Sequence, residues 1–221
     1  MGRRIAGVYP TGDLTQIPQL LPFGLHSAEE WPALEAVNRG LADLLIFTDE
    51  LAVWFGLFEE AEAAERAAFK ERIADPSLFR IRQILAAQGA VMSTWHFGKA
   101  MAGMRVAIKQ SETLGALVDQ SALKDAHRLF NRYFREPMGD SEFRQAVAHA
   151  GERSTEVTPL KAPQPQRVLN GRRYAYMSAR GAYVLTITSE TVGLLVGVRE
   201  TFYTAFKRAA EVLAQPRPGA R

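Results

Sequence analysis

The stretch Leu41-Ala-Asp-Leu-Leu-Ile-Phe-Thr-Asp-Glu-Leu-Ala-Val-Trp-Phe-Gly-Leu-Phe58 is the most apolar window of the sequence, and it decides the fold class. Its large apolar side chains recur at steps of three and four residues, which is the spacing of one face of an α-helix. Asp43, Asp49 and Glu50 interrupt the window, and charges at those depths are costly in lipid. We therefore expect a long amphipathic helix and no membrane span.

The same periodicity extends on both sides of this window. Ser27 followed by Glu30 has the pattern of a capping box, and a helical pattern then runs over about residues 33–73. The breaker residues 75–77, Asp-Pro-Ser, end it, and a second helical pattern covers about residues 78–117. The sequence thus predicts two long antiparallel helices.

Shorter elements are expected in the second half of the chain. A third helix is predicted over 122–134, and Gly-Asp-Ser at 139–141 precedes a short fourth helix. The apolar period changes to two within about residues 166–188, where Asn170-Gly171 is a strong hairpin signal. A last helix is predicted over about 189–213.

These elements predict a mainly α fold, an antiparallel helical bundle with a small β-hairpin or meander before a C-terminal helix. The chain has 221 residues, 47% of them hydrophobic, which suffices for a substantial core. We expect a single helical domain over 27–213, with the β insertion at about 166–188. Residues 1–26 are expected to form an irregular arm and residues 214–221 a frayed tail.

Composition excludes several classes of chemistry. The sequence contains no cysteine, which rules out disulfides, thiolate nucleophiles and the usual structural zinc sites, and fits a reducing cytoplasm. The N-terminus begins with charges, but Pro10 and Asp13 arrive before an apolar run develops, so an export signal is not expected. There is no P-loop, dinucleotide-binding or nucleophile-elbow motif, and the histidines lack metal-ligand spacing. We expect no metal and no cofactor.

The positive charge is mild overall but concentrated locally. The formal net charge is +3, which permits contact with nucleic acid without demanding it. Basic residues gather between Leu160 and Tyr183, and no acidic residue follows until Glu190. This region therefore carries a local positive bias.

The one sharp chemical feature is the segment Phe143-Arg144-Gln145-Ala146-Val147-Ala148-His149. Arg144 and His149 are separated by roughly 140° around an ideal helix, whereas Gln145 shares the face of His149. Arginine complements charge on phosphate oxygens, and histidine transfers a proton near neutral pH, so the pair suits a phosphodiester. The alternative is a capped helix with a surface arginine and a packing histidine.

In this context the segment resembles the Arg-x4-6-His motif of the HEPN superfamily. The likeness in layout extends from about Ala33 to Leu213, two long helices and a third shorter one before the motif helix, with strands and a closing helix after it. The resemblance implies a helical bundle, a homodimer in which two motifs face one RNA cleft, and a metal-independent ribonuclease or a non-catalytic binding module.

The resemblance also implies roles for the motif residues. Arg144 would stabilise the scissile phosphate, and His149 would transfer a proton or orient the RNA 2′-hydroxyl. Gln145 would take the supporting polar position, where asparagine, aspartate or histidine is commoner in the family.

The basic, tyrosine-containing region is the candidate for RNA contacts outside the motif. Its phosphate-binding and base-stacking residues would be Arg172, Arg173, Tyr174, Tyr176 and Arg180. The alternative is that Tyr174 and Tyr176, which share one strand face, pack on the bundle while the arginines are solvated.

Two hypotheses follow. The first is a homodimeric HEPN-like protein that binds RNA. In its stronger form, this hypothesis adds metal-independent cleavage of the RNA through Arg144, Gln145 and His149. The second is a non-catalytic helical protein that binds a partner protein or a small ligand. Neither involves a membrane.

Overall fold

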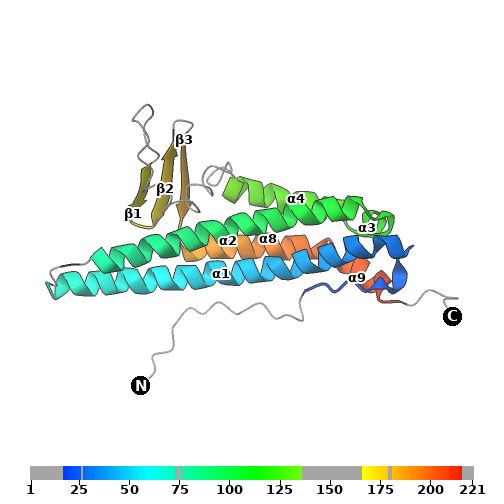
Figure 1. The fold of residues 1–221 in the computed structure, drawn as a ribbon, viewed down its shortest axis with the longest axis horizontal. Coiled ribbons are helices and arrows are strands. Elements are labelled where there is room, and N and C mark those ends of the chain that lie inside the picture. Colours follow the sequence, from blue (N-terminus) through cyan, green and yellow to red (C-terminus); the bar gives the residue numbers. More distant parts are fainter. Residues whose placement is uncertain are drawn as a thin grey trace, which may run out of the picture. The chain divides into compact units, whose positions relative to one another are not determined.

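A computed structural model describes residues 17–25, 27–72, 75, 77–135, 166–178 and 181–215. Figure 1 shows the two long helices, α1 (Trp31–Lys70) and α2 (Ser77–Lys109), together with the shorter elements. These are η2 (Pro22–Gly24), η3 (Ala28–Glu30), α3 (Glu112–Leu117), α4 (Gln120–Phe130), η4 (Asn131–Arg135), β1 (Gln166–Asn170), β2 (Arg173–Ser178), β3 (Gly181–Thr186), α8 (Ser189–Thr204) and α9 (Lys207–Leu213). The prediction of a mainly helical fold with a small sheet before the C-terminal helices is confirmed.

Helices α1 and α2 are the predicted pair, and they pack against each other. The carboxylate of Asp75 accepts a hydrogen bond from the backbone N–H of Ser77 at 2.9 Å, which satisfies a free donor at the start of α2. The second helix was predicted to run to about residue 117, and this boundary is wrong. The hydroxyl of Ser111 accepts from the N–H of Leu114 at 3.1 Å and starts a separate helix, α3.

The chain divides into two compact units, and α1, α2 and α8 each contribute to both. The first unit contains Glu50–Trp95 and the described residues of Asn131–Leu194, and the second contains the described residues of Pro10–Asp49, His96–Phe130 and Leu195–Arg221. The single domain predicted over 27–213 stays a prediction.

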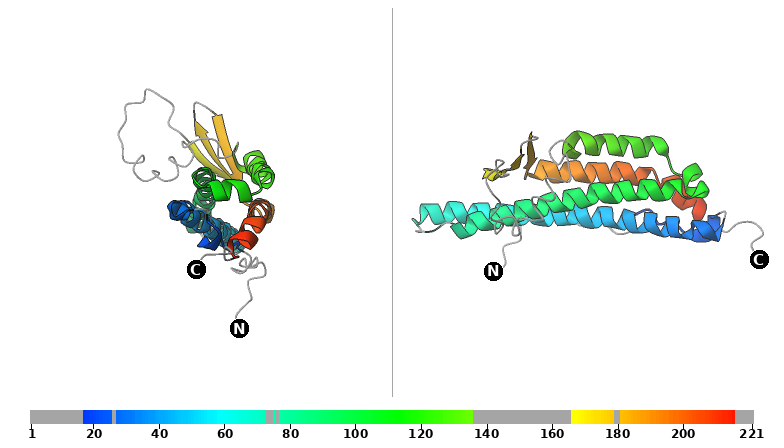
Figure 2. Two further views of the ribbon diagram at one scale, coloured as in Figure 1. Left: turned by 90° about the vertical axis from the view of Figure 1, so that its right-hand side faces the viewer. Right: turned by 45° about the horizontal axis from the view of Figure 1, so that its top comes forward.

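The first unit combines a helical hairpin, from the α1 and α2 segments, with the sheet. The three strands lie side by side in the order β1-β2-β3, and both pairings are antiparallel, so the sheet is a meander (Figure 2). Asn170 pairs with Arg173, and the intervening Gly171 has a φ of +55°, a conformation that glycine adopts without strain. The predicted turn at Asn170-Gly171 is thereby confirmed.

A tight contact joins the two helices of this hairpin. A Cβ atom added to Gly89 of α2 would lie 2.3 Å from the indole of Trp54 on α1. The hairpin core is completed by residues that are almost fully buried, among them Leu51, Phe55, Phe58, Ala87, Ala90 and Val91. The sheet contributes Leu169, Tyr174 and Leu185, and the segment after it contributes Ile187 and Val192.

The second unit is held together by polar links between segments far apart in the sequence. The hydroxyl of Tyr203 donates to the carbonyl of Leu41 at 2.8 Å. The N–H of Leu20 donates to the side-chain oxygen of Asn38 at 3.0 Å, and the amide of Asn38 returns a bond to the carbonyl of Leu20 at 2.8 Å. Residues just before η2 are therefore fixed on α1, within the arm that the sequence left irregular.

Glu30 links the start of α1 to a distant part of the second unit. Beside it, Ser27 caps η3 by accepting a hydrogen bond from the N–H of Glu29. The Glu30 carboxylate accepts from the Ser111 hydroxyl at 2.6 Å, from the Thr113 N–H at 2.9 Å and from the Thr113 hydroxyl at 2.6 Å. Glu30 is buried, 7% exposed, so this carboxylate connects the start of α1 to α3.

The C-terminal helix was predicted as one element and is two. Helix α8 ends at Thr204, where the N–H groups of Ala205 and Phe206 donate to the carbonyls of Phe202 and Tyr203, and α9 begins at Lys207. At the other end, the Thr188 hydroxyl accepts from the N–H of Thr191 and caps α8. The predicted helix over 122–134 is observed as α4 followed by the π-helical turn η4.

None of the described helices combines the length and the apolar character needed to cross a membrane.

Replacing Glu30 by alanine is expected to lower the free energy of unfolding by about 2–4 kcal/mol, because three buried donors lose a charged acceptor. The matched control is Ser27→Ala, which removes an exposed cap and is expected to cost about 0.5–1 kcal/mol. Urea titration of both variants measures the difference. A smaller loss for Glu30→Ala than for Ser27→Ala would contradict the structural role of Glu30.

Candidate functional site

The predicted catalytic residues, Arg144, Gln145 and His149, lie outside the described residues. Arg180, the last of the predicted phosphate contacts, lies outside them as well. Their roles therefore stay predictions, and the described part of the candidate RNA interface consists of the turn and strand that carry residues 172–176.

Arg172 is bound to the helical hairpin of the first unit. Its Nη2 atom lies 2.7 Å from a Glu62 carboxylate oxygen and 3.1 Å from one of Glu59, both on α1. The hydrogen bond to Glu62 raises the pKa of the guanidinium above its ordinary value, and Glu59 adds to this effect. Because both carboxylates already neutralise it, Arg172 serves as an anchor for the β1–β2 turn more than as a phosphate ligand.

A second polar link joins strand β1 to α2. The guanidinium of Arg80 donates to the carbonyl of Leu169 and also to the Gln83 side chain, the latter at 3.2 Å. The Gln83 side-chain amide in turn donates to the Glu65 carboxylate on α1. The turn and its first strand are therefore fixed on both helices of the hairpin.

Tyr174 packs against this unit and offers no free ring face. Its side chain is 1% exposed, and its hydroxyl accepts a hydrogen bond from the Gln88 amide at 3.4 Å. A base-stacking residue needs an accessible ring, so the assignment of Tyr174 to RNA contact is replaced by the alternative of packing. Tyr176 pairs through its backbone with Arg167 and Tyr183, and its side chain lies outside the described residues.

Arg173 differs from its neighbours because it is exposed. Its backbone pairs with Asn170 and with Thr186, which fixes the residue at the edge of the turn. Within the described ranges, it makes no ion pair. Of the predicted phosphate contacts whose side chains the structure describes, Arg173 is the one that remains free for an anion.

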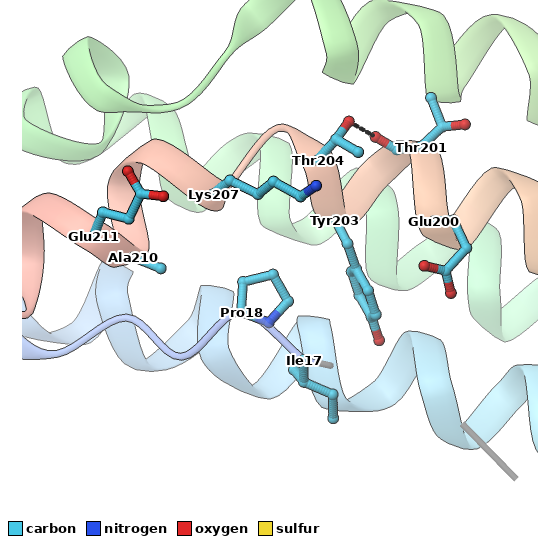
Figure 3. A pocket seen from close by; sticks show the side chains of 9 residues that line it. All are labelled: Ile17, Pro18, Glu200, Thr201, Tyr203, Thr204, Lys207, Ala210 and Glu211. Atoms are coloured by element: carbon cyan, nitrogen blue, oxygen red, sulfur yellow. Dashed lines mark hydrogen bonds between the residues drawn. The ribbon is translucent and has the colours of Figure 1, made fainter. Parts of the chain in front are cut away.

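The second unit contains an open cavity of about 700 Å³, shown in Figure 3. Its lining comes from residues 17–18, from α8 and from α9, and its charged members are Glu200, Lys207 and Glu211. The Thr201 and Thr204 hydroxyls already donate to backbone carbonyls. The lining thus offers a ligand one ammonium and two carboxylates, of which that of Glu200 is already paired with Arg199. Sequence reasoning did not identify this set.

The buried Tyr203 lines this cavity, and the buried Arg199 precedes the lining residue Glu200 in α8. Burial raises the pKa of the Tyr203 hydroxyl above its ordinary value, so it stays protonated and donates to Leu41. Arg199, 6% exposed, places its guanidinium 2.7 Å from the Glu200 carboxylate and 5.9 Å from the centre of the Tyr203 ring. The Glu200 carboxylate is therefore partly engaged before any ligand arrives.

The described histidines do not form a metal site. His96 contacts the Phe47 ring, with 5.3 Å between the ring centres. His127 lies edge-on to Phe202, with 6.0 Å between the centres, and its Nε2 atom is buried without a hydrogen-bond partner among the described residues. Across the described ranges, no cluster of histidine, cysteine or acidic side chains is suited to hold a metal ion.

The chain matches none of the protein families, characterised proteins or solved structures with which it was compared.

Adjacent arginines at the turn give a matched pair of variants. Arg172→Ala is expected to lower the free energy of unfolding by about 1 kcal/mol, because it breaks a half-exposed pairing with two carboxylates. Arg173→Ala is expected to change it by less than about 0.5 kcal/mol. Thermal unfolding of both variants measures the effects, and equal stability would contradict the anchoring role of Arg172.

His127 makes stability depend on pH below neutrality. Burial first, and then the charge of Arg105, lower the pKa of His127 below its ordinary value of 6.5. The unfolded chain therefore binds a proton more readily, and the free energy of unfolding should fall as pH drops below about 6.5.

The loss should continue until the folded-state pKa of His127 is passed. His127→Phe, which cannot be protonated, is expected to show a shallower loss of stability between about pH 7 and pH 5. Urea titration at several pH values measures the slopes. Identical slopes in wild type and variant would exclude His127 as the cause.

Proposed function

We propose that this chain is a HEPN-like RNA-binding protein that cleaves RNA without a metal ion and works as a homodimer. The observation that carries the proposal is the segment Phe143 to His149, whose sequence contains an arginine, an amide and an imidazole within one short stretch of a mainly helical chain. The order of elements supports it, since a long helical hairpin and a shorter helix precede the segment and a sheet and closing helices follow it.

The chemistry of these residues fits a phosphodiester substrate. Arg144 is a permanent cation that stabilises the negative charge growing on phosphate oxygens. Histidine is the side chain suited to proton transfer near neutral pH, so His149 would transfer the proton that the reaction displaces, or orient the RNA 2′-hydroxyl. Gln145 precedes His149 by four residues, the spacing of one helical turn, and would supply a supporting hydrogen bond. Cleavage by this set needs no metal ion.

The basic turn of the sheet gives the RNA a second contact. Arg173 is exposed and unpaired among the described residues, so it is available to a phosphate. Arg172 and Tyr174 attach the turn and its strand to the hairpin, the first by its ion pair with Glu62 and the second by its hydrogen bond with Gln88. The proposed binding surface therefore includes Arg173 and leaves Tyr174 out.

A second candidate function is non-catalytic binding of a protein or a small ligand. The observation that favours it is the open cavity of about 700 Å³ in the second unit, whose lining includes Glu200, Lys207 and Glu211. In this alternative, Arg144 and His149 cap and pack a short helix and carry no chemistry.

Arg144→Ala and His149→Ala are each expected to abolish RNA cleavage measured in the presence of a chelator, because one loses the cation and the other the proton carrier. The matched control is Arg208→Ala, which removes the same charge from an exposed position on α9 and should leave cleavage unchanged. Circular dichroism checks that the variants fold. Cleavage at the wild-type rate in both motif variants, or none in wild type, would contradict catalysis and favour the second candidate.

A further inference from the structure

The cavity of about 530 Å³ on the α1–α2 hairpin is a groove lined mostly by apolar side chains. Its lining consists of the small residues Ala61, Ala64 and Ala86, the larger residues Trp54, Leu57 and Leu85, and the charged residues Glu60 and Arg82. All of these residues belong to the first unit.

Large apolar side chains extend this groove along both helices. On α1, Val53 is 60% exposed and Leu57 is 44% exposed, and on α2, Ile81 is 52% and Leu85 is 55% exposed. Each pair is separated by four residues, so its members share one helix face. Exposed apolar surface that continues over two helices is typical of a protein interface, because water contact with it is unfavourable.

The two charged residues of the groove have opposite signs and lie on different helices. Glu60 is on α1 and Arg82 is on α2, and both are exposed. Within the part of the chain that the structure describes, neither forms an ion pair. The groove thus carries one unpaired positive and one unpaired negative group beside an apolar surface.

We propose that the occupant of this groove is the same hairpin of a second copy of the chain. In a two-fold symmetric interface, a contact between one residue and another occurs twice. When α1 of one copy lies against α2 of the other, Glu60 meets the second copy's Arg82, and the reverse pair forms at the same time. The apolar residues beside them then fill the two grooves.

This charge pattern favours a second copy over a foreign helix. An interface between two copies requires self-complementary charges, and the Glu60 and Arg82 pair meets that requirement. The result is a four-helix arrangement, in which antiparallel hairpins commonly pack. The inference names the dimer surface of the proposed function, but it does not depend on RNA binding, because association is measured without RNA.

Sedimentation equilibrium of the full chain without RNA is expected to give twice the mass of one chain. Leu85→Glu should shift the population to single chains, because it places a charge in the apolar interface. Val106→Glu is the matched control, since Val106 also lies on α2 and is 58% exposed. This control should leave the dimer intact, and circular dichroism should show that both variants fold.

Charge reversal tests the register of the two copies. Glu60→Arg and Arg82→Glu should each weaken association at least about tenfold, because like charges then face each other across the interface. The double variant, with both reversals, restores opposite charges and should associate within about threefold of wild type. These sites are exposed, so the substitutions leave the core of the monomer unchanged.

A wild-type chain that sediments as a single copy would overturn the proposal, and the groove would then belong to a different partner. The dimer proposal would also be overturned if Leu85→Glu weakened association no more than Val106→Glu. The same holds if the double charge reversal failed to recover the affinity between copies that each single reversal lost. RNA cleavage by the wild-type chain is measured in parallel. A wild-type chain that forms the dimer but cleaves no RNA contradicts the RNA proposal alone and leaves the dimer interface standing.

Discussion

The packing of α1 on α2 in the first unit is the constraint on which the rest of that unit depends. Both helices carry apolar side chains on more than one side, and a hairpin buries only the sides that face inward. The contact of Trp54 with Gly89 brings the helices close, and residues such as Phe58 and Val91 fill the core. The remaining apolar residues, including Leu57 and Leu85, stay exposed, which leaves the hairpin a second surface to bury.

The hairpin also determines what the basic residues near the sheet can do. Arg172 forms ion pairs with Glu59 and Glu62, and Arg80 donates hydrogen bonds to the Leu169 carbonyl and the Gln83 side chain. A local excess of positive charge in the sequence therefore does not translate directly into a phosphate-binding surface. Part of it attaches the β1–β2 turn to α1. Among the described side chains of this region, the exposed neighbour Arg173 is free for an anionic ligand.

Local patterns predicted the elements of this fold, and long-range contacts explain where those predictions were wrong. The helical period identified α1 and α2, and Asn170-Gly171 identified the hairpin turn, because both signals lie within a few residues. The partners of Glu30 lie 81 and 83 residues away, a distance at which spacing carries no information. Periodicity also shows which residues share a face but does not show which of two apolar faces is buried, so the exposure of Leu85 was not foreseen.

For the candidate site, the sequence supplied Arg144, Gln145 and His149, which lie outside the described residues. The burial of Tyr174 decided between stacking and packing.

Cross-linking between chains shows whether two copies meet through the α1–α2 hairpin face, as we propose. Because the natural chain has no cysteine, single cysteines at positions 60 and 82 can be introduced in separate proteins without background. When Glu60→Cys and Arg82→Cys proteins are mixed and treated with a short bis-maleimide, we expect more cross-linked dimer than either protein gives alone. A yield in the mixture no higher than in the separate proteins, or no higher than with Val106→Cys replacing one of them, would rule out contact through this face.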